Sequence, residues 1–269
     1  MERIELRTIF PAARPVIGML HAPPLPGAPR WQPPFSRVIE HVLADAAALH
    51  HAGVDALLLE NFGDVPFYGE RVPAETVAGM AVLAREVRAA VPLPLGINVL
   101  RNDAAAALAV ASATGARFIR VNVHVGTMLT DQGQLTGRAA ETLRLRAALG
   151  VPVAILADVL VKHAVAPAGL TAAAAARDTW YRGLADALVV TGAATGAATD
   201  LARIHEMRTA LPGAPLLVGS GVNADSVAGL LAETDGAIIG SAFEHGGRAG
   251  AGVDGDRARR LMEQVRSIR

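Results

Sequence analysis

The sequence predicts one α/β domain of the (β/α)₈ TIM-barrel class, and three observations support that prediction. Short continuous apolar runs, as expected of parallel strands buried on both faces, alternate with helical patterns. The alternation repeats eight times, the number of units that closes a barrel. No composition shift marks a linker, so 1–269 should form a single domain, with 1–14 as a lead-in and 243–269 holding the closing helix. A doubly wound open sheet is the alternative, but it seldom needs eight uninterrupted units.

The expected elements follow one another regularly along the chain. Eight apolar runs are the predicted strands: Pro15–Leu20, Val54–Leu59, Leu95–Leu100, Ala116–Val123, Val153–Ala157, Ala187–Thr191, Leu216–Gly219 and Gly236–Gly240. Ser36 and Asn223 are expected to cap the first and seventh helices, and Gly53 to follow the end of the first. The other helices are expected over 73–90, 103–114, 138–149, 171–183, 199–211 and 254–268.

Composition excludes several classes of protein. The formal net charge is zero, so the chain carries no basic footprint for nucleic acid. It contains no cysteine, which rules out disulfides and thiolate chemistry. We expect a cytoplasmic protein, because no signal-peptide pattern and no apolar run of membrane-spanning length is found. A homo-oligomer is compatible with the sequence.

Polar residues gather at the ends of the predicted strands. In a TIM barrel the active site lies at the carboxyl ends of the strands. The opposite ends offer only single polar residues such as Asp55 and Asp186. Alternation in the fourth strand points Arg120 into the barrel, where it needs a carboxylate partner, either Glu60 or Asp158. The candidate catalytic residues are Glu60, Asp158, Lys162, Arg120, Asn122, His21 and Asn98. A structural ion pair remains the alternative for Arg120.

Lys162 is the only lysine, since the other 24 of the 25 basic residues are arginines. Lysine is a compact charge that can lose its proton, whereas arginine stays protonated. Lys162 follows the fifth predicted strand, which ends near Asp158. It could therefore bind an oxyanion or form a Schiff base, and the sequence favours the first role because a loop lysine would be mobile.

Glycine and serine follow the last three predicted strands. Barrels commonly bind phosphate on backbone N–H groups after strands seven and eight, where glycine allows close approach. Thr195–Gly196 extends the pattern after strand six. Ordinary tight turns are the alternative explanation. The phosphate-binding candidates are Gly192, Gly219, Ser220, Gly221, Gly240 and Ser241.

These strand-end motifs together resemble one family. The segments that carry the resemblance are Gly18–Gly27, Glu60–Phe67, Gly96–Asp103, Phe118–Asn122, Asp131–Gly133, Ala157–His163 and Thr191–Gly196. They resemble the BtpA/SgcQ family, which is named after a cyanobacterial factor needed for photosystem I accumulation. The resemblance implies a barrel related to phosphate-binding TIM barrels, and it implies no established reaction.

Two functions remain open at this stage. The first is an enzyme that acts on a small phosphorylated metabolite, a sugar phosphate or a nucleotide-derived sugar. Glu60 and Asp158 would be acid/base groups and Arg120 would stabilise negative charge, as isomerase, lyase or hydrolase. No cofactor is certain, and a divalent metal on His21, Glu60 and Asp158 is left open. The second is a non-catalytic assembly or stability factor for photosystem I biogenesis, which would need an exposed apolar patch. Its candidate residues are Trp31, Phe35, Phe62, Phe67 and Tyr68.

Overall fold

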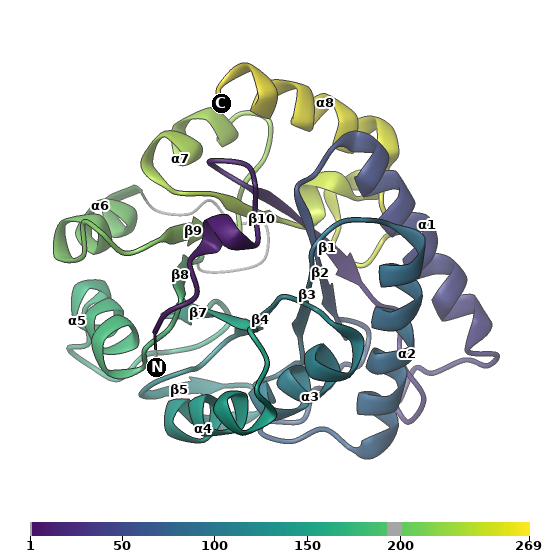
Figure 1. The fold of residues 1–269 in the computed structure, drawn as a ribbon, viewed down its shortest axis with the longest axis horizontal. Coiled ribbons are helices and arrows are strands. Elements are labelled where there is room, and N and C mark those ends of the chain that lie inside the picture. The colour runs from purple at the N-terminus through teal and green to yellow at the C-terminus, as the bar shows by residue number, and fades with distance from the viewer. Residues whose placement is uncertain (1, 193–200) are drawn as a thin grey trace.

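A closed barrel of parallel strands forms the centre of the molecule, as predicted (Figure 1). The computed structural model describes residues 2–192 and 201–269. Within those ranges the eight barrel strands, in the order in which neighbours pair, are β1 (Val16–His21), β2 (Ala56–Glu60), β3 (Leu95–Asn98), β4 (Phe118–Val121), β7 (Ala154–Val159), β8 (Ala187–Val190), β9 (Leu216–Val218) and β10 (Ala237–Ile239). Pairing of β1 with β10 closes the barrel, with Gly18 opposite Ile239.

Helices surround the barrel (Figure 1). They are α1 (Ser36–Ala52), α2 (Ala74–Ala90), α3 (Ala104–Thr114), α4 (Ala139–Leu149), α5 (Ala172–Arg177), α6 (Leu201–Ala210), α7 (Val227–Glu233) and α8 (Gly255–Ser267). The chain continues α5 as a π-helical segment, Asp178–Arg182. Gly53 ends α1 at φ 87°, a left-handed conformation that glycine adopts without steric cost.

Two predicted caps are wrong. Ser36 is already the first residue of α1, and the cap position is Phe35, which makes no side-chain cap hydrogen bond. The side-chain oxygen of Asn223 accepts from the amides of Asp225 and Ser226 at 2.9 and 3.0 Å, which closes a turn of its own. Because that turn precedes the helix, α7 begins only at Val227.

A small hairpin that the sequence reading missed lies between β4 and α4. Its strands are β5 (Thr127–Thr130) and β6 (Gly133–Thr136). Leu129 and Val165 exchange backbone hydrogen bonds of 2.9 and 2.8 Å. The hairpin therefore contacts the loop that follows β7, which carries Lys162.

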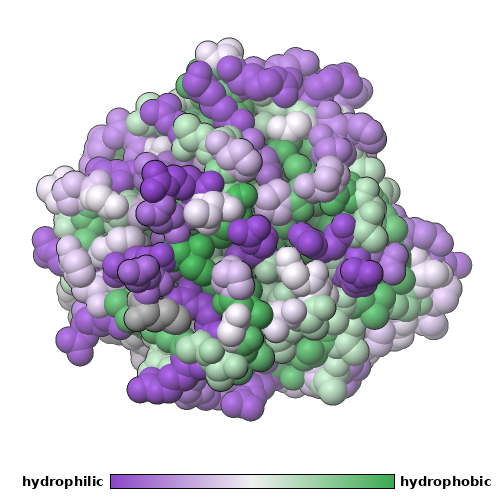
Figure 2. All heavy atoms as spheres, viewed as in Figure 1, coloured by the Kyte–Doolittle hydropathy of each residue, from purple (hydrophilic) through white to green (hydrophobic). Residues whose placement is uncertain are grey.

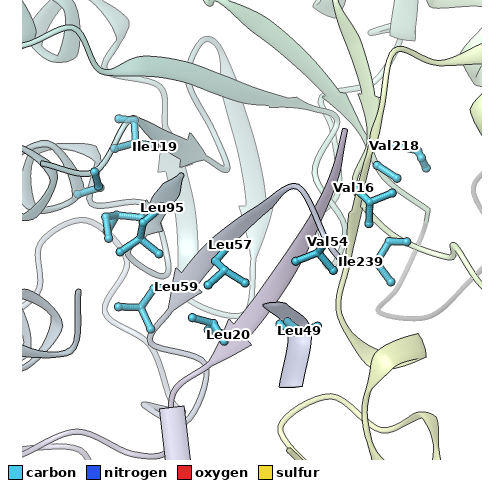
Figure 3. Close-up of a cluster of buried hydrophobic side chains, with 14 of the residues drawn as sticks. Val16, Leu20, Leu49, Val54, Leu57, Leu59, Leu95, Ile119, Val218 and Ile239 are labelled. Carbon is cyan, nitrogen blue, oxygen red and sulfur yellow. The ribbon is translucent and has the colours of Figure 1, made fainter. Parts of the chain in front are cut away.

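Two apolar layers hold the barrel wall. The inner layer fills the barrel with side chains such as Ile17, Leu58 and Leu217, and Phe10 closes it from below against Phe118, with ring centroids 5.3 Å apart. The outer layer packs the strands against the helices. Figure 3 shows it with Leu57 and Leu59 from β2 and Leu49 from α1. Alternate residues of each strand serve each layer, as the two-residue period requires.

The N-terminal segment covers the lower end of the barrel, which faces the viewer in Figure 1. Arg3 donates to the carbonyl oxygens of Trp180 and Ala185 at 2.6 and 3.1 Å. The amide of Ile4 donates to Asp186 at 2.8 Å. Apolar side chains on this face lie in patches between polar ones (Figure 2). Among the described residues, no helix has the length and apolarity that crossing a membrane requires.

Candidate active site

A ring of buried polar side chains lies at the carboxyl end of the barrel, where the sequence placed them. Strand register sets His21 opposite Glu60 and Glu60 opposite Asn98. Asn122 follows β4 and Asp158 lies near the end of β7. All five side chains are buried. Burial of so many polar groups at one end is expected to cost stability, which is typical of a functional site.

Arg120 and Asp158 form a buried ion pair in this ring. Arg120 donates from Nε to Oδ1 at 2.9 Å and from Nη2 to Oδ2 at 3.0 Å. The partner of Arg120 is therefore Asp158 rather than Glu60. Burial acts to lower the pKa of the Arg120 guanidinium, but attraction to Asp158 and Glu60 outweighs burial and raises it. Arg120 stays positively charged in a two-pronged geometry that carboxylates favour.

Two asparagines extend the pair into a network. Asn122 donates to Asp158 Oδ2 at 3.2 Å. Asn98 donates from one nitrogen to Asn122 Oδ1 at 3.1 Å and to the backbone oxygen of Arg120 at 3.0 Å. The remaining side-chain oxygen of Asn98 is buried without a hydrogen-bond partner among the described residues. A buried acceptor of this kind is the group that a bound water or ligand would satisfy.

His21 is held by a carboxylate that the sequence reading missed. Its Nδ1 makes a short contact with Oε1 of Glu244, which lies beyond β10 and is 2 % exposed. Its Nε2 faces Glu60 Oε1 at 3.8 Å. The Phe62 ring lies 4.5 Å from the imidazole, centroid to centroid. A Cβ on Gly240 would lie 2.8 Å from His21 Cε1, so glycine leaves the ring its space. The sequence feature that could have identified Glu244 as a site residue is its position just after the last predicted strand.

The loop carrying Lys162 is fixed by hydrogen bonds on both sides of the residue. The Lys162 amide donates to Thr191 Oγ1 at 3.1 Å. Its carbonyl oxygen accepts from Arg101 Nη2 at 2.7 Å. Leu160 and His163, on either side, adopt left-handed conformations at φ 53° and 55°. Non-glycine residues rarely adopt this conformation, and where they do it often marks a functional site. Hydrogen bonds therefore hold the backbone at Lys162, and the mobility expected of its side chain stays a prediction.

Lys162 reaches a charged environment inside the barrel mouth. Burial lowers the pKa of its amine, and the positive charges of Arg120 and Arg101 lower it further. Glu60 and Asp158 act in the opposite direction without restoring the ordinary value. The amine therefore loses its proton more readily than that of an exposed lysine.

One pocket joins this cluster to the glycine-rich turns after β9 and β10. It contains about 410 Å³ of empty space, part of it open to solvent, and is lined by Lys162, Arg120, Glu60, His21, Gly219, Ser220, Gly221, Gly240 and Ser241, with neighbouring apolar residues. Gly192 lies beside this group, because its amide donates to Ser220 Oγ at 2.7 Å. Thr195–Gly196 lies outside the described residues. Four of the seven predicted catalytic residues and five of the six predicted phosphate-binding residues thus line one pocket, whereas Asp158 and Asn122 line a separate hollow beside the hairpin.

Two of the turn glycines also have a packing role. A Cβ on Gly219 would lie 3.2 Å from Arg120 Nη2 and 2.4 Å from Val189. Gly240 makes room for His21 in the same way. Gly221 has φ 72°, which favours glycine for the turn itself. Close packing thus explains the first two glycines, and a ligand is not needed to account for them.

The structure does not assemble the metal site that the sequence left open. Over 2–192 and 201–269, no group of three His, Cys, Asp or Glu side chains could hold a metal ion. Both oxygens of Asp158 are bound by Arg120 instead.

The aromatic residues near the mouth do not form one patch. Trp31 and Phe35 lie 6.1 Å apart by ring centroids and pack against the core. Phe62 contacts His21, whereas Tyr68 is 58 % exposed. Phe67 lines a separate hollow beside Tyr68. The apolar surface required by the assembly-factor hypothesis is therefore dispersed.

The family model that matches this sequence covers residues 12–267 and is described as the BtpA family. The chain belongs to the BtpA family. It is 42 % identical to the photosystem I biogenesis protein BtpA of a Synechocystis strain, over 97 % of this chain and 91 % of that protein. An uncharacterized Pyrococcus horikoshii protein is 43 % identical, over 95 % and 97 %. An uncharacterized mitochondrial protein of Caenorhabditis elegans is 32 % identical, over 100 % and 99 %.

Solved structures with low sequence identity share the fold of this BtpA-family protein. Phosphoribosyl anthranilate isomerase from Thermus thermophilus matches with a TM-score of 0.58 at 13 % identity, over 95 % of this chain and 100 % of that one. Tryptophan synthase from M. tuberculosis matches with a TM-score of 0.59 at 15 % identity, over 98 % of both. At these identities the likeness concerns the barrel alone.

Proposed function

We propose that this protein is an enzyme that acts on a small phosphorylated metabolite at the carboxyl ends of the barrel strands. The observation that carries the proposal is the single pocket shared by the glycine-rich turns and by Lys162, Arg120, Glu60 and His21. Such turns suit a phosphate group, and the polar ring supplies acid, base and charged groups within the same space. Sugar phosphates and nucleotide-derived sugars are the substrate classes that we favour.

Glu60 is the acid/base group that the geometry favours. Among the residues that the structure describes, none donates a hydrogen bond to its carboxylate, which lines the pocket. Asp158 is occupied by Arg120 and Asn122, so we assign it to holding Arg120 in place. Arg120 would stabilise negative charge that develops on the substrate. His21, oriented by Glu244, would pass protons to and from the Glu60 side of the pocket.

A ligand panel tests this proposal. Thermal unfolding is recorded with phosphorylated sugars, nucleotides and inorganic phosphate. A ligand at about 100 times its Kd stabilises the folded state by roughly 2.7 kcal/mol, which raises Tm measurably. Ser241→Glu should abolish the rise, because it places a negative charge where the phosphate would bind.

Gly229→Glu is the matched control, since it adds the same charge at an exposed position on α7 with open space around it. The control should retain the full rise in Tm. An equal rise in Tm in both variants would show that the phosphate does not bind at these turns. If no compound in the panel raises Tm, the proposal is wrong.

A second candidate function is an assembly factor for photosystem I. The observation that favours it is the 42 % identity to the Synechocystis protein of that name. Relatives in an archaeon and a nematode, neither of which is photosynthetic, favour an activity independent of photosystems. An assembly factor would keep its effect on photosystem I when Glu60 and Lys162 are replaced, whereas an enzyme would lose it.

A further inference from the structure

We propose that Lys162 is a covalent catalyst that forms a Schiff base with the carbonyl group of a small phosphorylated aldehyde or ketone. This inference rests on the proposed function and narrows its substrate class. It replaces the oxyanion-binding role that the sequence alone favoured, because the loop and the amine have properties that an anion contact does not require.

The chemistry of lysine favours a covalent role for Lys162 over anion binding. An oxyanion can be held by either basic side chain, and arginine holds it with more hydrogen bonds. This chain uses arginine at 24 of its 25 basic positions. Arginine cannot act as a nucleophile because it keeps its proton, whereas lysine can. The one lysine lines the pocket together with Arg120, Glu60 and His21.

The backbone of the loop that carries Lys162 is held in place. Hydrogen bonds from the Lys162 amide to Thr191 and from Arg101 to the Lys162 carbonyl fix the backbone from both sides. Left-handed conformations at Leu160 and His163 flank the segment, and Lys162 lines the pocket at the barrel mouth. A covalent nucleophile needs a fixed approach to its target, and a simple charge contact does not.

Burial and nearby charged groups decide the protonation of the Lys162 amine. Arg120 from β4 and Arg101 from the loop after β3 disfavour a positive charge on Lys162, whereas Glu60 from β2 and Asp158 from β7 favour it. Burial is the largest influence, and the resulting pKa is below that of an ordinary lysine. A larger fraction of the amine is therefore neutral at physiological pH, and only the neutral amine attacks a carbonyl carbon.

The proposed reaction balances without an oxidant or reductant. The Lys162 nitrogen attacks the carbonyl carbon, the carbonyl electron pair moves to oxygen, and a proton passes from nitrogen to that oxygen. Arg120 stabilises the negative charge while it exists. The resulting hydroxyl takes a second proton from Glu60 and leaves as water, which leaves an iminium ion. The iminium accepts the electron pair of an adjacent C–H bond, whose proton passes to Glu60, or of an adjacent C–C bond, in which case the other fragment leaves as a carbonyl compound and the proton of its hydroxyl group passes to Glu60. Reprotonation and addition of water release the product and the amine.

The lining of the pocket indicates the substrate class. Lys162 and the turns Gly219–Gly221 and Gly240–Ser241 line the same pocket. A molecule with its phosphate on these turns would present to Lys162 a carbonyl only a few bonds away. Short phosphorylated sugars in their open-chain form have that geometry.

Labelling with pentane-2,4-dione tests the amine without knowledge of the substrate. This small diketone forms an enaminone with neutral amines, and peptide mass spectrometry separates Lys162 from the N-terminal amine. Lys162 of the folded protein should react at pH 7 several times faster than in the urea-unfolded chain, because burial and the nearby arginines lower the pKa of its amine. An equal or slower rate would overturn the proposal, because a lysine that a small ketone cannot reach or that stays protonated cannot form a Schiff base.

Borohydride trapping tests the covalent step. The protein is incubated with dihydroxyacetone phosphate, glyceraldehyde 3-phosphate or ribose 5-phosphate and reduced with borohydride. Its mass is then measured by intact-protein mass spectrometry. At least one compound should add its reduced mass at Lys162, and Lys162→Met should show no adduct there. Lys162→Arg keeps the charge and loses the nucleophile, so it should turn over substrate more than about 10³-fold more slowly. A retained rate in Lys162→Arg would restore the oxyanion-binding role.

The two proposals fail in different ways. If phosphorylated carbonyl compounds raise Tm but none is trapped, the Schiff base is excluded and the phosphate-binding enzyme stands. If no phosphorylated compound raises Tm or is trapped, both proposals fail.

Discussion

Two buried arginine–aspartate pairs lie at opposite ends of the same barrel and have different surroundings. At the lower end Arg146 pairs with Asp186, whose carboxylate also accepts the amides of Ile155 and Ile4 at 2.7 and 2.8 Å. At the mouth Arg120 pairs with Asp158. Both pairs are almost completely shielded from solvent.

The surroundings show what each pair does. Besides Arg146, the partners of Asp186 are backbone amides, so the lower pair joins β7 to the N-terminal segment. The neighbours of Asp158 are the side chains of Arg120 and Asn122, beside a pocket and the amine of Lys162. A buried ion pair alone is weak evidence for either stability or function. Its remaining partners, backbone in one case and pocket side chains in the other, distinguish the two roles.

The largest effect is expected at the lower end. Asp186→Ala leaves Arg146 buried without its carboxylate and removes the acceptor for two amides, so unfolding free energy should fall by about 3–5 kcal/mol. Urea denaturation followed by circular dichroism measures the loss. The folded fraction should keep its Tm response to phosphorylated ligands. A loss below about 1 kcal/mol would mean that the lower pair is not structural.

A substitution in the ion pair at the mouth of the barrel should reduce turnover. Asp158→Asn preserves the shape but removes the charge that orients Arg120, so turnover of a substrate found in the ligand panel should fall about 10²–10³-fold. Asp186→Asn is the matched control at the lower end, and its folded fraction should turn over within about twofold of the unchanged protein. Similar turnover in both variants would contradict the difference between the two ends.

Glu244 should act through His21. Glu244→Gln keeps the hydrogen bond but removes the charge, and kcat should fall about tenfold to a hundredfold, as for other residues that orient a histidine. Because Glu244 positions His21 and does not touch the pocket, KM should change little while the pH dependence of kcat shifts. An unchanged pH profile together with a lower Tm would assign Glu244 a purely structural role.

The smallest effect is a gain in stability. The folded protein lowers the pKa of Lys162, so the unfolded chain binds this proton more tightly. Protonated Lys162 therefore destabilises the fold at neutral pH, and that penalty disappears as pH rises from the lowered pKa toward the ordinary lysine value. Lys162→Met should raise Tm by a few degrees at pH 7, and the gain should shrink toward pH 10. A gain that does not change with pH would place its origin in packing.

The sequence predicted the barrel better than it predicted the contacts within it. Strands such as Ala56–Glu60 were recognisable because burial on both faces requires continuous apolar residues. The polar ring was predictable because Glu60 and Asn98 end their strands. The choice of Asp158 as the partner of Arg120 depended on the register of the neighbouring strands β4 and β7, which no local pattern records.

The missed features lie in short or irregular segments. Glu244 lies in a short irregular segment beyond β10, where no period of two or of 3.6 residues applies. The hairpin Thr127–Thr136 has strands of only four residues each, held partly by the contact of Leu129 with Val165. The hydrogen bonds that hold the backbone at Lys162 come from Arg101 and Thr191, which are distant in the sequence, so no local pattern records them.

Closure of the barrel through β1 and β10 has a consequence for synthesis on the ribosome. The register places Ile17 opposite Ile238. One edge of β1, the first strand to be synthesised, therefore stays unpaired until β10, the last strand, has been made. A nascent chain can pair β1, β2 and β3 early, yet it keeps two open sheet edges until Ala237–Ile239 emerges. Messages that end before this point would therefore yield chains whose exposed edges invite aggregation and degradation.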